Sequence, residues 1–528
     1  MSELSIRDRI KAILKGLNED LYEKDYAIRM VLLSALAGES IFLLGPPGVA
    51  KSMIARRLKY VFKNAKTFEY LMGKFSTPDE VFGPVSISKL KDEDKYERMV
   101  KHYLPGANIV FLDEIWKASP PIQNALLTVL NEKIFRNGEK EIEVDLRALI
   151  AASNELPMKG EGLEALWDRF LIRILIENID GDQAFESMIS MSGGAGKEEL
   201  IEEELQISHS EYKHWKDQID GVHLPPHILG LLSFLRNNIR QRNLTLEQED
   251  FMYVSDRRWR KIVQILRASA FLNGRKEVHV MDVFLVSDCI WDKVEQREEA
   301  HALVLGAVTG AGYRKLVNIQ PILAEMNILR KEIDEAIHLR YKEMVEDLKV
   351  YKDEKGASFY KVKDFWGGSD AFIQQDKWRS IKEDAEEPTY VPMFERNDKI
   401  FRPFQTLDIR KSGTANLVNK NNHFDLETEM VEKERIEKKV PAEGLTRIWN
   451  SQIKLLLDIC EEGVKTIEAR QEIDQEHMDN HLFVSKEFAD HVASSLTSTT
   501  NDLLNLKLEV QKTRYMYESI KQGTPGTE

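Results

Sequence analysis

The segment GPPGVAKS at residues 45–52 combines the residue types that surround a phosphate group. It follows the apolar run IFLL and precedes the helix-like stretch MIARRLKYVF. A strand, a loop with inward backbone N–H groups and a helix starting at the anion form a phosphate-binding loop. Lys51 would reach the β- and γ-phosphates and Ser52 would bind Mg²⁺. A Gly/Pro turn without a ligand is the alternative. The predicted nucleotide contacts in the loop are Gly45, Pro46, Pro47, Gly48, Val49, Ala50, Lys51 and Ser52.

Two adjacent carboxylates follow a second apolar run, in the sequence IVFLDEI at residues 109–115. Asp113 is positioned to hold Mg²⁺, and Glu114 to orient and polarise an attacking water molecule. An isolated Asp-Glu pair can simply cap the next helix. Here the pair ends a hydrophobic strand downstream of the phosphate loop, and the two motifs reinforce each other.

An asparagine and a tyrosine are further candidates for this site. Asn154 follows the apolar strand 148–152 and would help to position the attacking water; its alternative role is to cap the next turn. Tyr22 precedes the first buried helix and would stack on adenine, although a place in the core is the commoner role for such an aromatic residue.

Two arginine-containing segments would stabilise transferring charge. In LEALWDRFLIRI, Arg169 is the candidate arginine finger for a neighbouring subunit, with Arg173 in reserve; pairing of Arg169 with Asp168 is the alternative. In SDRRW, which is expected to open a helix, Arg257 would touch the γ-phosphate, with Arg258 close behind. A solvated basic turn is the alternative for this second segment.

Composition limits the class of protein. The chain has 528 residues, 42% of them hydrophobic, which suffices for several folded domains. It contains no run of eighteen apolar residues, and its first helix lacks the core of a signal peptide. The two cysteines, Cys289 and Cys460, lie in apolar helix-like settings and are expected to be inert core thiols. The sequence therefore predicts a cytoplasmic protein, and a net charge of −14 disfavours a general nucleic-acid coat.

The first 308 residues have the pattern of a two-part nucleotide-binding module. Strands are expected at 41–44, 109–112, 148–152 and 172–176, alternating with helices in an α/β sheet over residues 1–180. Residues 181–308 read as a helical lid. Two hairpins are expected before the later strands, one at 85–103 with a charged tip and one at 134–147 around Asn137-Gly138.

The remainder is expected to form a long-helix bundle interrupted by a small β domain. Apolar residues at steps of three and four define three helical seams. The bundle would comprise 309–348 and 432–522, the β-rich insertion 349–431, and a disordered tail 523–528; a poorly ordered insertion is the alternative. The seams are Met326, Leu329, Ile333, Ile337, Tyr341, Met344 and Leu348; Leu445, Trp449, Ile453, Leu456, Cys460, Val464 and Ile467; and Phe488, Val492, Leu496, Thr499, Leu503, Leu506 and Val510.

These motifs together resemble a known family. GPPGVAKS with Ala before Lys, FLDEIWKASPPIQNALLTVLNE, AASNELP, WDRF and SDRRW are similar to the MoxR branch of AAA+ ATPases, and in detail to its RavA (regulatory ATPase variant A) group. The resemblance is close over residues 1 to about 290 and architectural beyond 308. It implies a homo-hexameric ring with Mg²⁺ and ATP bound between subunits. It also implies the roles given above for Lys51, Ser52, Asp113, Glu114, Asn154, Arg169 and Arg257.

The resemblance also suggests partners. Family members usually work with a protein that carries a von Willebrand factor A domain. In the RavA group the β domain docks an inducible lysine decarboxylase, but residues 350–430 do not match the segment expected for that docking, which leaves this partner in doubt.

Three functions stay open at this stage. The first is an ATP hydrolase that remodels or helps to assemble protein partners. The second is a nucleic-acid motor, since some replicative helicases share such loops with Ala; the acidic balance and the absence of a recognisable DNA-binding domain oppose it. The third is a nucleotide-dependent adaptor with slow turnover whose β domain binds a partner.

Overall fold

The computed structural model describes residues 4–157, 162–190, 200–313, 319–365, 370–383 and 385–522. The chain divides into two compact units, one of residues 1–322 with 457–508 and one of residues 323–456 with 509–528. Each unit is described by itself. The expected tail at 523–528 lies outside the described residues.

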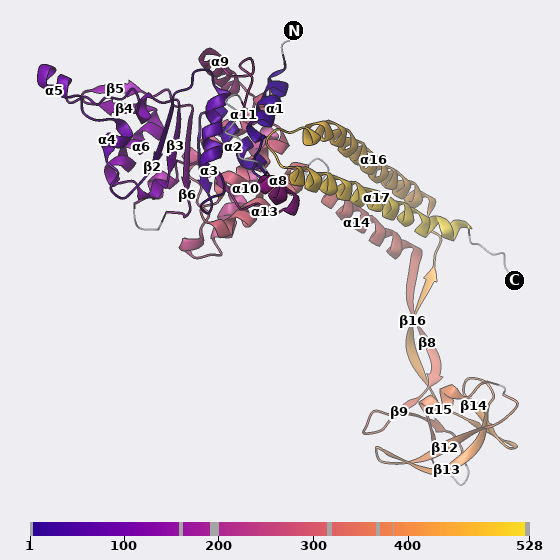
Figure 1. Ribbon diagram of the computed structural model, residues 1–528. Coiled ribbons are helices and arrows are strands. Elements are labelled where there is room, and N and C mark those ends of the chain that lie inside the picture. Colours follow the sequence, from indigo (N-terminus) through magenta and orange to yellow (C-terminus); the bar gives the residue numbers. More distant parts are fainter. Residues whose placement is uncertain are drawn as a thin grey trace. The chain divides into compact units, whose positions relative to one another are not determined.

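The first unit is built on a five-stranded parallel sheet in the order β2-β3-β6-β1-β7 (Figure 1). The four expected strands are confirmed with bounds shifted by a residue at most, because buried parallel strands are continuous apolar runs. The edge strand β2 was not expected, since its exposed positions alternate with half-buried ones. The strands are β1 Ser40–Leu44, β2 Thr67–Leu71, β3 Ile109–Asp113, β6 Ala148–Ser153 and β7 Ile172–Leu175.

Helices cover this sheet and continue into an all-helical segment. The helices that precede or alternate with the strands are α1 Ile6–Asn18, α2 Asp25–Ala37, α3 Lys51–Arg57, α4 Pro78–Phe82, α6 Pro120–Glu132 and α7 Glu164–Trp167. The later ones are α8 Asp182–Ser190, α9 His209–Asp220, α10 Pro226–Asn243, α11 Asp256–Leu272, α12 Ser287–Ile290 and α13 Arg297–Ala307. As expected, every named element of the described residues from 181 to 308 is helical.

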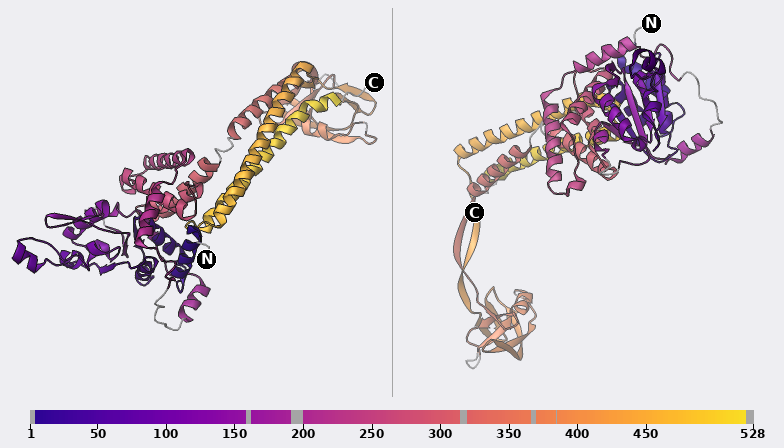
Figure 2. Two further views of the ribbon diagram at one scale, coloured as in Figure 1. Left: turned by 90° about the horizontal axis from the view of Figure 1, so that it is seen from above. Right: turned by 90° about the vertical axis from the view of Figure 1, so that its left-hand side faces the viewer.

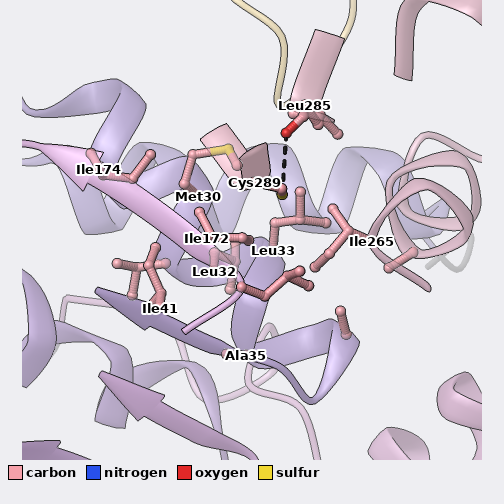
Figure 3. Close-up of a cluster of buried hydrophobic side chains, with 14 of the residues drawn as sticks. Met30, Leu32, Leu33, Ala35, Ile41, Ile172, Ile174, Ile265, Leu285 and Cys289 are labelled. Atoms are coloured by element: carbon pink, nitrogen blue, oxygen red, sulfur yellow. Dashed lines mark hydrogen bonds between the residues drawn. The ribbon is translucent and has the colours of Figure 1, made fainter. Parts of the chain in front are cut away.

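Helix α2 joins the sheet to the later helices. Ten of its residues are buried, so it is apolar on nearly all sides, as a helix packed between two layers must be. Figure 3 shows Met30 and Leu33 of α2 among Ile172 of β7, Ile265 of α11 and Cys289 of α12. The Cys289 thiol donates to the Leu285 carbonyl 3.4 Å away, and burial raises the pKa of this thiol. The expectation of an inert core cysteine is confirmed.

The two expected hairpins dock on one another. Strands β4 Ile134–Asn137 and β5 Lys140–Glu143 pair as expected, with Gly138 at φ +66°. Residues 85–103 are not a plain hairpin: a pairing between Val85 and Arg98 encloses a helix, α5 Ile87–Glu93, which Ser86 caps. The Asn137 side chain accepts from the Arg98 backbone N–H at 2.6 Å and donates to its carbonyl at 3.1 Å.

A buried carboxylate completes this junction. Glu97 is 6% exposed and forms ion pairs with Lys89 of α5 and with Lys140 of β5, the latter at 3.0 Å. The hydrogen bonds from Lys89 and Lys140 lower the pKa of Glu97 to about 2. The two insertions are therefore held together as one projecting element, at whose end α5 lies (Figure 1).

The first long seam is interrupted, which corrects the expectation of a single helix to residue 348. Helix α14 Ile319–Ile337 buries Met326, Leu329 and Ile333 as expected. The chain then becomes strand β8 His338–Leu348, which pairs antiparallel with β16 Thr428–Lys438. Met344 of β8 is 56% exposed, so its place in the helical period was coincidental.

The β8–β16 ribbon is stabilised across its strands rather than by a core. Lys342 pairs with Glu432 at 3.2 Å and Arg435 with Glu343 at 2.9 Å, and such cross-strand charge pairs favour strands over helix. Figure 2 shows the two strands side by side and leading to a small β domain.

That domain is a seven-stranded antiparallel sheet in the order β15-β14-β13-β12-β11-β10-β9. Its core includes Val362, Ile373, Trp378, Val391 and Ile409. The insertion is thus folded and β-rich, as the sequence indicates. Its elements are β9 Val350–Lys352, β10 Ser358–Val362, β11 Ala371–Gln374, α15 Gln375–Ser380, β12 Thr389–Asn397, β13 Ile400–Lys411, β14 Asn416–Asn419 and β15 Asn422–Asp425.

Two long helices, α16 Glu443–Asp479 and α17 Lys486–Gln522, follow the other two seams. Within the second unit, Trp449 of α16 donates to Glu332 of α14 at 3.0 Å, and Tyr517 of α17 donates to Asn450 at 2.8 Å. Three helices therefore pack together there, as predicted. Leu445, the first residue of its seam, is 38% exposed.

In the first unit, the turn between α16 and α17 is anchored by a buried ion cluster. His481 Nδ1 accepts from the backbone N–H of Phe483 and Val484 at 3.2 and 3.0 Å. His481 Nε2 lies 3.1 Å from Asp282, whose carboxylate also accepts two hydrogen bonds from Arg275. With both ring nitrogens so engaged, the geometry fits a neutral imidazole that donates from Nε2.

This turn should lose its anchor in mild acid. Burial lowers the pKa of His481, so the unfolded imidazole, with a pKa of about 6.5, binds a proton more readily than the folded one. The contribution of His481 to the free energy of unfolding is therefore complete above about pH 6.5 and decreases as the pH falls below that value. Burial opposes ionisation of Asp282, but Arg275 and His481 outweigh it and lower its pKa, so Asp282 stays ionised in this range. His279, whose backbone N–H donates to Asp282, is the other titratable neighbour.

The expected result is faster backbone hydrogen exchange at residues 480–485 as the pH falls from 7.5 to 5.5, after correction for intrinsic exchange. His481→Asn keeps an acceptor and a donor without a titration in this range and should flatten the pH dependence. Equal protection of the wild-type turn across this range would contradict the assignment.

Candidate nucleotide-binding site

The carboxyl ends of three neighbouring strands bring the predicted polar residues to one edge of the sheet. Leu44 pairs with Ser153, and Asp113 with Ala152, so the phosphate loop, the carboxylate pair and Asn154 all start at the same level. The Gly45 N–H donates to the Ser153 carbonyl at 3.2 Å, which ties the loop to β6. In open α/β sheets, ligands bind at this edge.

The loop has the backbone that a phosphate cradle needs. Gly48 and Ala50 both have positive φ, +89° and +67°. Glycine adopts this region freely, whereas alanine at such a position costs on the order of 1 kcal/mol. Helix α3 begins at Lys51, directly after the loop, so its N-terminal N–H groups face the same space.

Lys51 links the loop to Asn154. It is 7% exposed, and its Nζ donates to Asn154 Oδ1 at 2.7 Å, to the Pro46 carbonyl at 3.1 Å and to the Gly45 carbonyl. Burial lowers the pKa of Lys51, while Asp113 and Glu114 act to raise it. These oxygens are the acceptors that phosphate oxygens would replace.

The carboxylates supply an oxygen site for a metal and a candidate for water activation. The hydroxyl of Ser52, half-buried beside Lys51, and the carboxylate of Asp113 are the hard oxygen donors that Mg²⁺ prefers, so the residues fit the expected ion. Glu114 has φ +51°, a strained value of the kind found at functional sites. Its side chain lies 3.3 Å from Lys117.

A cavity of about 640 Å³ lies between the end of β7 and the start of α2, and its lining contains none of residues 45–52. Its lining includes Ile176, whose carbonyl a Cβ on Gly45 would approach to 2.2 Å. Tyr22, the predicted adenine contact, does not line this cavity, whereas Tyr26 does. The sequence analysis did not select Tyr26, because the helix that contains it is mostly apolar. A polar hydroxyl in the first turn of such a helix is the signal that could have marked it. Lys24, Arg297 and residues 174–180 are also in the lining.

The predicted arginines lie at the opposite edge of the sheet. The Arg169 carbonyl accepts from Ser40 Oγ at 2.5 Å, beside the first residue of β1. Five residues of β1 separate that point from the phosphate loop, or about 15 Å. Arg257 Nη1 donates to Asn131 Oδ1 at 3.1 Å, near the end of α6, a helix about 20 Å long that begins near Glu114.

Arg169 and Arg257 are close to one another there. Burial lowers the pKa of Arg169, and the charge of Arg257 lowers it further. Arg169 also pairs with Asp168 at 3.3 Å, the alternative that the sequence left open. SDRRW opens helix α11 as expected, with Ser255 as its N-cap, and Ser255 donates to Asp168 at 3.2 Å, which fixes this end of α11 beside Arg169. Arg257 is thus not brought to Lys51 of its own chain.

The two reserve arginines are structural. Arg173 is fully buried, and its Nη1 lies 2.5 Å from Asp292 Oδ1. Its guanidinium carbon lies 3.8 Å from the centroid of the Trp167 ring. Burial lowers its pKa to about 9. Arg258 is 2% exposed and pairs with Asp168 at 3.1 Å. Neither side chain faces outward, which leaves Arg169 and Arg257 as the candidates for a second subunit.

A phosphate loop after the first strand, an acidic pair after a neighbouring strand and a helical lid define a P-loop nucleotide-binding module. Residues 8–216 match the family described as the MoxR domain in the MoxR-vWA-beta-propeller ternary systems, and residues 227–304 match an AAA lid domain. The chain belongs to the MoxR family of AAA+ ATPases.

Three relatives are similar to different shares of the chain. An uncharacterized protein of Methanocaldococcus jannaschii is 37% identical over 295 residues, 56% of this chain and 73% of the relative. A second uncharacterized protein of that organism is 33% identical over 387 residues, 66% of this chain and 98% of the relative. The chaperone MoxR1 of Mycobacterium tuberculosis is 28% identical over 155 residues, 29% of this chain and 40% of the relative.

Proposed function

We propose that the protein is a Mg²⁺-dependent ATP hydrolase that works as a ring, with each ATP bound between two subunits. The observation that carries the proposal is the division of the site. Lys51, Asp113 and Asn154 lie at one edge of the sheet, and Arg169 with Arg257 at the other. This separation supports the proposal that Arg169 and Arg257 act on the nucleotide of a neighbouring copy and not on that of their own chain.

Each residue has a role in this arrangement. Lys51 binds the β- and γ-phosphates, and Ser52 and Asp113 hold the metal ion. The metal ion, held by Ser52 and Asp113, would supply positive charge that stabilises the negative charge developing on the phosphates. Glu114 accepts the proton of the attacking water, and Asn154 orients that water. Arg169 and Arg257, from the neighbouring subunit, stabilise the transferring phosphoryl group.

Ring size and partners are part of the proposal. We propose a hexamer, by family resemblance, that remodels or assembles protein partners, as the name of the chaperone relative suggests. A von Willebrand factor A protein is the favoured partner, because the matched family is described in MoxR-vWA systems. The β domain would be the docking head, and by resemblance to the RavA group a lysine decarboxylase is a second candidate partner.

The cellular location also stays a prediction from the sequence. Among the helices of the described residues, none combines the length and the apolar character needed to cross a bilayer.

Glu114→Gln tests the hydrolytic role. This variant should bind ATP with Mg²⁺ as tightly as the wild type but hydrolyse it about 10²-fold more slowly, since the base is lost and the shape is kept. Phosphate release and equilibrium nucleotide binding are the two measurements. Glu141→Gln, on the exposed β5 strand, is the matched control. Normal turnover by Glu114→Gln would refute the role, and very slow turnover by the wild type would favour a nucleotide-dependent adaptor.

A further inference from the structure

The cavity near the phosphate loop includes Arg297 of the lid helix α13 in its lining, and a buried hydrogen bond links it to α12 as well. The Tyr26 hydroxyl, in the cavity lining, donates to Asp288 Oδ2. Asp288 belongs to α12 and is 2% exposed. Burial and the neighbouring carboxylate raise the pKa of Tyr26 well above its usual value, so its proton stays in this bond. In Figure 3, Cys289 of α12 lies close to Met30 of α2, one turn beyond Tyr26.

The second oxygen of the same carboxylate faces a histidine. His301 Nε2 of α13 lies 3.7 Å from Asp288 Oδ1, too far for a hydrogen bond, and this nitrogen has no hydrogen-bond partner. A movement of about 1 Å would form that bond. The observed arrangement of Asp288 and His301 is therefore the open one, and only this small movement separates it from a bonded one.

The histidine in turn contacts α17. The His301 ring lies 5.4 Å from the Phe488 ring, and Phe488 stacks on Phe284 at 4.5 Å with a 21° angle between planes. Phe488 is the third residue of α17. The first turn of this helix thus rests on lid side chains, one of which faces the carboxylate that holds Tyr26.

The turn before α17 is fixed to the same surface. Besides the His481 cluster, the Leu482 N–H donates to Asn273 at 3.0 Å and Arg7 donates to the Asn480 carbonyl at 2.8 Å. Residues 480–488 are therefore held to the lid through Asn273 and the His481 cluster, and to α1 through Arg7.

From these contacts we infer that nucleotide occupancy is transmitted to the start of α17 through the series Tyr26–Asp288–His301–Phe488. The inference rests on the proposed nucleotide site. A nucleotide in the cavity contacts Tyr26 and shifts Asp288, which changes the His301 contact and the packing of Phe488. The long helices would thereby report the state of the nucleotide site. Tyr26 and Asp288 act as positioning residues in this series, and chemistry stays with the residues at the loop.

Hydrogen exchange on the full chain tests this coupling. Two states are compared: the nucleotide-free protein, and protein saturated with Mg²⁺ and either ADP or a non-hydrolysable ATP analogue. The backbone hydrogen-exchange rate at residues 483–496 should differ about fivefold or more between them. His301→Phe keeps an aromatic ring against Phe488 but removes the nitrogen that faces Asp288, and should reduce this change to less than about twofold while nucleotide still binds. Phe271→Leu, an aromatic of α11 that packs on Trp215 instead, should leave the change intact.

Reciprocity gives a second readout. A coupling between two sites has the same size in both directions, so Phe488→Leu should shift the Kd of a fluorescent nucleotide by up to the same factor. A wild-type protein that binds nucleotide without any change at 483–496 would overturn the coupling and leave the proposed ATPase standing. A wild-type protein that fails to bind nucleotide would overturn both.

Discussion

ATP turnover by an Arg169→Ala variant should fall by roughly 10³-fold or more, because an arginine donated across an interface stabilises charge that exists only in the transition state. Nucleotide binding by the same chain should change little. Arg169 lies about 15 Å from its own phosphate loop, one strand length away, and cannot contact the nucleotide bound there. Rate measurements at saturating ATP, together with a binding titration, separate the two effects.

Arg257→Ala should behave in the same way, since Arg257 lies beside Arg169 and carries the same charge. A matched control is Arg56→Ala, an arginine of α3 that is 63% exposed and pairs with Glu69 at 2.6 Å. This control should retain the parental rate. If Arg257→Ala instead weakened nucleotide binding by its own chain and left the turnover of bound ATP intact, Arg257 would be a contact within one subunit.

Lys51→Ala should remove nucleotide binding as well as hydrolysis. A charged hydrogen bond to phosphate contributes about 1.5–3 kcal/mol to binding, roughly a factor of 10 to 100 in affinity. Loss of its support for the transition state costs roughly another 10²-fold in rate, so the combined loss is about 10³-fold or more. The fold should survive, because most contacts of Lys51 are with loop carbonyls that water can satisfy once the side chain is gone.

Lys63→Ala, a partly exposed lysine 3.9 Å from Glu203, is the matched control for that variant. It should bind and hydrolyse ATP as the wild type does. Parental turnover by Lys51→Ala would show that the phosphate loop is not where ATP is bound.

The central sheet and its motifs could be predicted because their signals are local. A buried parallel strand is a continuous apolar run, and the residues that follow it must meet at the sheet edge, so Lys51, Asp113 and Asn154 could be grouped from the sequence. Helices α16 and α17 could also be predicted, because a long helix repeats its apolar residues at steps of three and four over many turns.

The features that the sequence did not reveal depend on contacts between distant segments. Residues 338–348 continue the period of α14 by chance, and only pairing with 428–438 makes them a strand. The lid position brings Arg257 to Asn131 and Arg169, a placement that no local pattern encodes. Tyr26 lines the cavity and donates to Asp288, a contact with a residue far along the chain that no local pattern indicates.

A mixture of two inactive variants tests the shared site most directly. Lys51→Ala and Arg169→Ala chains, co-expressed with different tags and purified through both, would form rings that contain both variants. In roughly a quarter of randomly formed interfaces an intact Lys51 meets an intact Arg169. The account predicts that such mixtures regain a substantial fraction of wild-type ATP turnover. Mixed rings that stay as inactive as either variant alone would contradict it.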